Sequence, residues 1–150
     1  MSYTQLLYHI VIRTKYSKKT IPTQHAAQLY KYITGYIKNK KSILYQINGI
    51  ENHIHILVSL HSSISLADFV KDLKTSSNLW IKASNNYPDF TNWGNKYAAF
   101  SVSYKEKDVL IKYIQNQKTH HSKIEFEDEY RKLINEAGII IDETYFLTDN

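Results

Sequence analysis

The sequence predicts a single α+β domain built on an antiparallel sheet. Two observations predict it: four short apolar segments alternate with two amphipathic segments in the order βαββαβ, and further helical segments follow. A length of 150 residues with 43% apolar content is enough for one core. This order is that of ferredoxin-like and RRM-like domains, whose four-stranded sheet carries its two crossover helices on one face.

The first predicted strand covers residues 6–13, and its nearly continuous apolar character is typical of a central strand. After a basic loop, Thr23 is the expected N-cap of a helix that runs to about residue 38. A second strand follows at residues 43–50. Turn residues occur at 48–49 and again at 51–52, so the sequence is compatible with a hairpin turn at either position.

The third predicted strand, residues 53–60, carries the most informative pattern. Because side chains alternate along a strand, four aliphatic residues from Ile54 to Leu60 share one face, and His53 and His55 share the other. Two imidazoles on neighbouring positions of one face can hold a divalent cation. The alternative is a pair of ordinary surface or hydrogen-bonded core histidines.

The second half of the chain predicts one more strand and three helices. Ser65 is the first residue of a capping-box-like motif, which predicts a helix that extends to about residue 83. A strand is predicted next, at residues 97–103. Ser103 and Glu106 form a capping box that opens a third helix, which we expect to run to about residue 121. A fourth helix at 128–137 ends at Gly138.

The third helix offers a second set of chemical groups. Tyr113 and Gln117 are four residues apart and therefore lie on one helical face. Tyrosine can act as a nucleophile, and glutamine offers a neutral oxygen ligand to a hard cation. If this helix lies across the open sheet face, both side chains reach the His pair. An amphipathic helix with an ordinary tyrosine at its edge is the alternative.

Taken together, these motifs resemble a known family. His53-Ile54-His55 resembles the His-hydrophobe-His motif of HUH endonucleases. Residues 113–117 resemble the Tyr-x-x-x-Gln helix of single-tyrosine transposases of small bacterial insertion sequences, the IS-two-hundred/IS-six-oh-five type, whose relatives include REP-associated tyrosine transposases. Further similar segments are 8–11, 14–16, 73–77, 93–97 and 100–103. One departure is residues 96–99, where the family often has a Gly-Tyr pair.

The resemblance implies a DNA transposase that cleaves and rejoins single-stranded DNA at insertion-sequence ends. Tyr113 would be the catalytic nucleophile, forming a 5′-phosphotyrosine bond, and His53, His55 and Gln117 would hold Mg²⁺ or Mn²⁺. Family members recognise hairpins near element ends. They are homodimers in which the catalytic helix serves the partner's His pair, so the resemblance implies a homodimer with shared sites. The similarity covers about residues 6–121 of a single domain, 1–150, leaving an acidic helix and tail at 122–150.

Charge is distributed in a way that suits a polyanionic partner. Residues 1–124 contain 17 Lys and Arg against 6 Asp and Glu, whereas residues 125–150 contain 2 against 8. A basic body is compatible with nucleic acid. The candidate DNA contacts are seven lysines in basic stretches: Lys18, Lys19, Lys38, Lys40, Lys41, Lys71 and Lys74.

Other classes are excluded or remain as alternatives. The chain has no cysteine, which excludes disulfides and thiolate metal sites. No segment approaches the roughly 20 apolar residues of a membrane span, and no signal-peptide core is present, so we expect no membrane partner and a cytoplasmic protein. An HUH nuclease acting on host repeats or replication origins, or a non-catalytic RRM-like module binding single strands, remain alternatives. His120 and His121 are more compatible with a helix-end role than with substrate contact, and Glu51 is an alternative auxiliary ligand.

Overall fold

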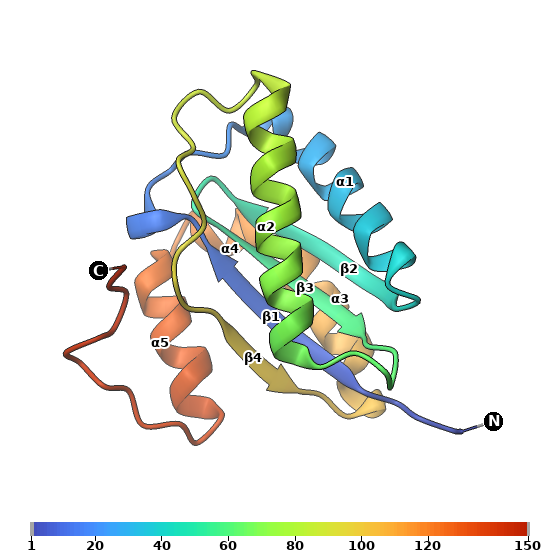
Figure 1. Ribbon diagram of the computed structural model, residues 1–150. Coiled ribbons are helices and arrows are strands. Elements are labelled where there is room, and N and C mark those ends of the chain that lie inside the picture. The colour runs from blue at the N-terminus through green and yellow to red at the C-terminus, as the bar shows by residue number, and fades with distance from the viewer. Residues whose placement is uncertain (1, 150) are drawn as a thin grey trace.

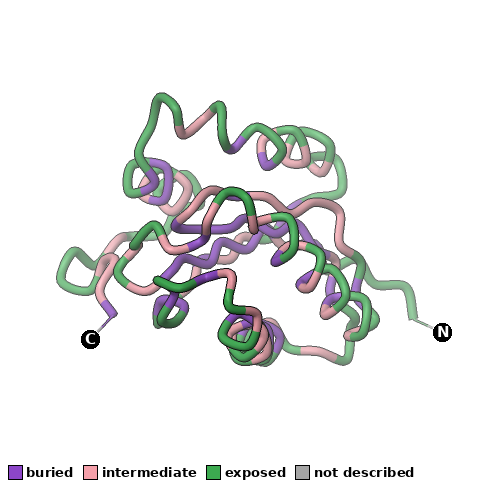
Figure 2. Tube along the Cα trace, turned by 90° about the horizontal axis from the view of Figure 1, so that it is seen from above, coloured by how far each residue is buried: buried purple, intermediate pink, exposed green. Residues whose placement is uncertain are grey.

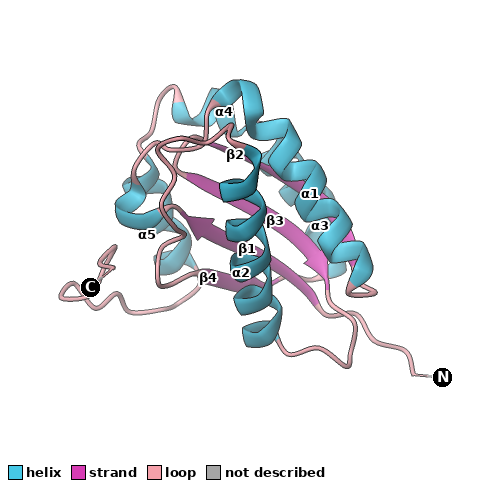
Figure 3. Ribbon diagram, turned by 45° about the horizontal axis from the view of Figure 1, so that its top comes forward, coloured by secondary structure: helices cyan, strands magenta, loops and turns pink. Residues whose placement is uncertain are grey.

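The computed structural model describes residues 2–149 and confirms the predicted order of elements (Figure 1). The first six elements alternate as βαββαβ, and three helices follow: β1 (Leu7–Arg13), α1 (Ala26–Asn39), β2 (Ile43–Ile50), β3 (His53–Ser59), α2 (Leu66–Ser84), β4 (Ala98–Ser101), α3 (Lys107–Gln115), α4 (Gln117–His121) and α5 (Phe126–Glu136). The strands form one antiparallel sheet in the order β2-β3-β1-β4. Figure 3 shows them side by side, with α2 crossing in front.

The sheet lies between two helical layers, and its central strands β1 and β3 are the most buried part of the chain (Figure 2). On one face, Ile54 and Ile56 of β3 join the main core with Ile33 of α1 and Phe69 of α2. This arrangement follows directly from the alternation of side chains along β3, because every second residue there is aliphatic.

The opposite sheet face is also covered. Leu57 of β3 packs with Ile114 of α3, and Val11 of β1 packs with Phe126 and Tyr130 of α5. The condition stated for the third helix is therefore met, because α3 lies across this sheet face, and α5 covers it as well. An RRM-like module needs this sheet face exposed to stack bases on it. The covering helices leave no such surface over the His pair, whose side chains are both 0% exposed.

The hairpin between β2 and β3 turns at Glu51 and Asn52, because Ile50 pairs with His53. Gly49 instead lies within β2, where a Cβ atom would stand 2.1 Å from the carbonyl oxygen of His53. The glycine is therefore required by close approach of the two backbones and does not mark the turn.

Two predicted helix boundaries are wrong. Thr23 does not cap α1; it begins a short 3₁₀ turn, and its hydroxyl donates a hydrogen bond to Glu51 Oε1 at 3.2 Å. The third predicted helix is interrupted at Asn116, which separates α3 from α4. Asn48 Nδ2 of β2 donates to the carbonyl oxygens of Ile114 and Gln115, both at 3.0 Å. A neighbouring strand thus supplies the partner that a continuing helix would have supplied.

Candidate active site

The His pair lies where the strand pattern predicts it. His53 and His55 project from β3 toward the layer that contains α3, α4 and α5, and their ring centroids are 5.0 Å apart. Both side chains are completely buried, so they belong to an interior cluster and not to an exposed surface.

Tyr113 and Gln117 both reach this pair. The Oε1 atom of Gln117 lies 3.0 Å from Nε2 of His53, and the ring of Tyr113 lies edge-on to that of His55 with centroids 5.8 Å apart. The break at Asn116 does not separate them from the site. All four side chains belong to one chain, so in this structure the tyrosine helix meets the His pair of its own chain. The sharing of sites between two subunits stays a prediction.

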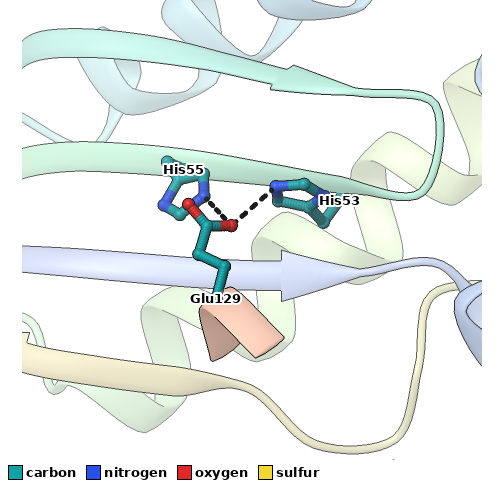
Figure 4. A group of neighbouring side chains, drawn as sticks. All are labelled: His53, His55 and Glu129. Carbon is teal, nitrogen blue, oxygen red and sulfur yellow. Dashed lines mark hydrogen bonds and ion pairs between the residues drawn. The ribbon is translucent and has the colours of Figure 1, made fainter. Parts of the chain in front are cut away.

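A residue that the sequence motifs do not identify lies at the centre of the cluster. Glu129 of α5 places Oε1 at 3.3 Å from Nε2 of His53 and 3.2 Å from Nε2 of His55 (Figure 4). Its Oε2 accepts hydrogen bonds from Tyr113 OH and, at 3.0 Å, from Gln117 Nε2. One feature of the sequence could have identified Glu129: it lies between Phe126 and Tyr130, on the apolar stripe of an otherwise acidic helix.

The two histidines at the end of α4 also face this carboxylate. Nε2 of His121 lies 2.8 Å from Oε1 of Glu129, and Nε2 of His120 lies 3.6 Å from Oε2. Both residues do form the last turn of α4, as the helix-end interpretation requires, and their rings also point into the cluster. Glu51 remains at the β2–β3 turn, hydrogen-bonded to Thr23, and is not part of the cluster.

A second group of side chains fixes the orientation of the His pair. His53 Nδ1 donates to Asn52 Oδ1 at 2.8 Å, and Asn52 Nδ2 donates to the carbonyl oxygen of Ser17 at 3.3 Å, which determines which way the amide points. The His55 ring has an equivalent partner, because its Nδ1 lies 2.8 Å from Nε2 of His9. Such outer partners set the tautomer and direction of metal-binding histidines.

The donor set fits a divalent cation. Burial lowers the pKa of His53 to about 4, so its ring is neutral at pH 7 and carries one proton. Because that proton is on Nδ1, the lone pair of Nε2 points at two oxygens, Glu129 Oε1 and Gln117 Oε1. A cation satisfies this arrangement of acceptors. Ligand atoms of His53, His55 and Glu129 all lie within 4.8 Å of one another.

Glu129 also governs the charge near the tyrosine. Burial alone would raise its pKa, but its contacts with the surrounding histidines, the hydrogen bond with His121 first among them, outweigh that effect and hold the pKa well below the ordinary value. Burial, followed by the hydrogen bond to Glu129, raises the pKa of Tyr113 above its ordinary value. Tyr113 therefore remains protonated as long as no cation neutralises the negative charge of Glu129.

Comparison with known proteins identifies the family. A sequence model described as "Transposase IS200 like" matches residues 2–117. The chain belongs to the IS200-like transposase family. Comparison with curated protein sequences finds no match. The matched region of this IS200-like transposase contains His53, His55, Tyr113 and Gln117, whereas Glu129 lies beyond its end.

Two solved structures share the fold of this transposase. A protein of Deinococcus radiodurans R1 classed as a transposase aligns with a TM-score of 0.61 and 23% identity, over 77% of this chain and 93% of the other. A REP-associated tyrosine transposase, solved with a REP hairpin bound, aligns with a TM-score of 0.62 and 11% identity, over 83% and 73% of the two chains. Among residues 2–149, no helix has the length and apolar character needed to cross a bilayer.

The lysines chosen from the sequence of this IS200-like transposase do not gather around the cluster. Five of them lie at the end of α1 or on α2, which cover the sheet face opposite the His pair; Lys18 and Lys19 are exposed in the loop after β1. The five are Lys38, Lys40, Lys41, Lys71 and Lys74. A cavity of about 440 Å³ opens instead beside Tyr113, and it is lined by Tyr113, Asn116, Thr119, His120, Lys123 and Ile124. Lys123 is a lysine that the basic stretches of the sequence do not single out.

Proposed function

We propose that this transposase cleaves and rejoins single-stranded DNA at insertion-sequence ends through a 5′-phosphotyrosine intermediate on Tyr113, with Mg²⁺ or Mn²⁺ held by His53, His55 and Gln117. One observation carries the proposal: the hydroxyl of Tyr113 and the Nε2 atoms of the His pair meet at the same carboxylate. A nucleophile and a candidate ligand set within reach of one group can act on one phosphate.

Each residue has a distinct role in this proposal. A bound divalent cation supplies Lewis acidity, polarising a phosphoryl oxygen and stabilising the charge that develops on it. His53 and His55 offer nitrogen ligands, and Gln117 offers an amide oxygen. Asn52 keeps the ligating nitrogen of His53 turned toward the site. In this proposal a single strand approaches Tyr113 through the cavity that this residue lines.

The covalent step is a transesterification. The hydroxyl oxygen of Tyr113 attacks phosphorus and gives up its proton, a phosphorus–tyrosine oxygen bond forms, and the bond to the 3′ oxygen breaks. That oxygen leaves and takes up a proton, so no net hydrolysis occurs. Because the phosphotyrosine conserves the phosphodiester bond energy, a second 3′-OH can reverse the step and join a new strand without a nucleotide cofactor.

We propose that the substrate ends contain hairpins and that the active form is a homodimer, because joining two ends with one tyrosine per chain requires two chains. The whole chain, 1–150, acts as one domain. Mixing His53→Ala with Tyr113→Phe chains tests how the sites are assembled. Recovered activity indicates α3–α4 exchange between subunits. No recovery supports sites built within each chain, as the contact between His53 and Gln117 favours.

The experiment that tests the chemistry is a denaturing gel for a protein–DNA adduct. Single-stranded oligonucleotides from the flanks of the gene, and a hairpin repeat from the host genome, are incubated with Mn²⁺. We expect an adduct with wild type and with Tyr104→Phe, an exposed control, and none with Tyr113→Phe. Metal-dependent cleavage without adduct indicates a hydrolytic nuclease. Binding without cleavage indicates a binding module. Adduct on the host repeat alone indicates a transposase relative that serves such repeats.

A further inference from the structure

We infer that Glu129 is itself a metal ligand, the anionic one, which α5 supplies so that the site holds its cation before DNA arrives. The inference rests on the proposed function and extends it to a residue outside the matched region, 2–117. The acidic C-terminal segment, 122–150, then contributes a residue to the site.

The geometry of the cluster already has the spacing of a coordination shell. Oε1 of Glu129 lies 3.3 Å from Nε2 of His53 and 3.2 Å from Nε2 of His55 (Figure 4). Adjacent ligands of an octahedral ion, each about 2.1 Å from the metal, are separated by about 3 Å. Two of the three separations therefore match those of neighbouring ligands of one ion, and all three ligand atoms lie within 4.8 Å of one another.

Charge gives an independent reason. His53, His55 and Gln117 offer neutral donors, so without Glu129 nothing in this set offsets a dipositive ion. The Glu129 side chain is 2% exposed, and its ion-pair partners among the described residues are histidines, with no Lys or Arg. A buried carboxylate is costly unless a positive group offsets it. A divalent ion at the His pair satisfies both needs together.

The helix that carries Glu129 is fixed against the site by packing. Phe126, one turn earlier on α5, stacks on His53 with ring centroids 4.2 Å apart. Phe126 and Tyr130 are both buried against Val11 and Ala98 of the sheet. A rigid element places a ligand more accurately than a loop does, so the position of Glu129 is a property of the fold.

The test is a titration of the DNA-free full chain with Mn²⁺, in which electron paramagnetic resonance measures the free ion. We expect wild type to bind Mn²⁺ and Glu129→Gln to bind it about 10-fold to 100-fold more weakly, since altering even outer partners of ligands costs this much. Glu127→Gln, an exposed neighbour on α5 with the same change of charge, should bind as wild type does. Circular dichroism checks that each variant is folded.

A second variant keeps the inference testable if Glu129→Gln does not fold. Glu129→Asp retains the charge but withdraws the oxygens by one methylene, so a ligand predicts weaker Mn²⁺ binding and a purely electrostatic role predicts wild-type binding. Wild-type affinity in both variants overturns the inference, and so does a wild-type chain that binds no Mn²⁺ without DNA. Faster cleavage by Glu129→Gln at unchanged Mn²⁺ affinity also overturns it, because the carboxylate then occupies the place of the scissile phosphate.

Two further results test the proposed function independently of the role of Glu129. His53→Ala should lose Mn²⁺ binding, and wild type should form the adduct, whatever Glu129 does. If those two results hold while Glu129→Gln binds Mn²⁺ normally, only the role of Glu129 is wrong. If no adduct forms on any substrate, the proposed chemistry is wrong even where Glu129 proves to be a ligand.

Discussion

Arg13 and Asp149, at opposite ends of the chain, form a buried bidentate ion pair. The two guanidinium nitrogens of Arg13 lie 2.7 and 2.8 Å from the carboxylate oxygens, and the side chains are 2% and 0% exposed. Asp149 also accepts hydrogen bonds from the backbone N–H groups of Tyr16 and Asn95, at 2.6 and 2.8 Å. The pair therefore attaches the segment after α5 to the end of β1 and to two loops.

We predict that Asp149→Ala lowers the free energy of unfolding by about 3 to 5 kcal/mol, because it leaves the Arg13 guanidinium buried without a partner. Urea denaturation at pH 7 measures the change. Glu143→Ala is the matched control, since it removes an exposed ion pair with Arg131 and should cost no more than about 1 kcal/mol. Equal losses in the two variants would show that the tail is not held by Asp149.

Stability should also fall in acid through this residue. Burial alone would raise the pKa of Asp149, but the hydrogen bonds from Arg13 and the two backbone N–H groups lower it below its ordinary value of 3.8. A carboxyl group with a lowered pKa stabilises the fold above its unfolded pKa and loses that contribution as the pH falls toward the folded pKa. We expect the urea midpoint of wild type to fall more steeply below about pH 4 than that of Asp149→Ala.

Gly49 should be irreplaceable although it is not a turn residue. Its Cβ would stand 2.1 Å from the His53 carbonyl oxygen, so Gly49→Ala must displace the strand that carries the His pair. We expect a loss of about 3 kcal/mol in the free energy of unfolding. Gly35→Ala on α1 has no atom within 4 Å of the new Cβ and should gain about 0.5 to 1 kcal/mol. A mild Gly49→Ala variant would contradict the pairing of Ile50 with His53.

Asn52 is predicted to affect the proposed metal site without being a ligand. Asn52→Ala removes the acceptor that holds the Nδ1 proton of His53, so the ring can turn or change tautomer. We expect Mn²⁺ affinity to fall about 10-fold to 100-fold. Asn86→Ala, on the loop after α2, is the control. Unchanged affinity would mean that packing against Phe126 alone orients His53.

DNA contact should involve Lys123 more than the lysines of the opposite layer. Lys123 lines the cavity beside Tyr113, whereas Lys38 is at the far end of α1 across the sheet. Fluorescence anisotropy at several salt concentrations should show weaker single-strand binding by Lys123→Ala, with the salt slope reduced by about 0.7. Lys38→Ala should bind as wild type does; the reverse ranking would place the DNA on the α1 and α2 layer.

Local sequence pattern determined the order of strands and helices and the face of the His pair. Alternation along β3 and the four-residue spacing of Tyr113 and Gln117 are consequences of backbone geometry, so they hold wherever the chain folds as strand and helix. That is why the sequence alone predicts that Tyr113 and Gln117 can reach His53 and His55, as they do in the structure.

Tertiary structure alone decided the turn at Glu51 and Asn52, the break at Asn116 and the place of Glu129. Both candidate turns have suitable residues, and only the packing of β3 distinguishes them. The helix break depends on Asn48, 66 residues before the carbonyl of Ile114 that it binds. Glu129 is one of eight acidic residues after position 124. It enters the site because α5 docks its apolar stripe on the sheet, and burial of that stripe is a long-range interaction that local sequence does not encode.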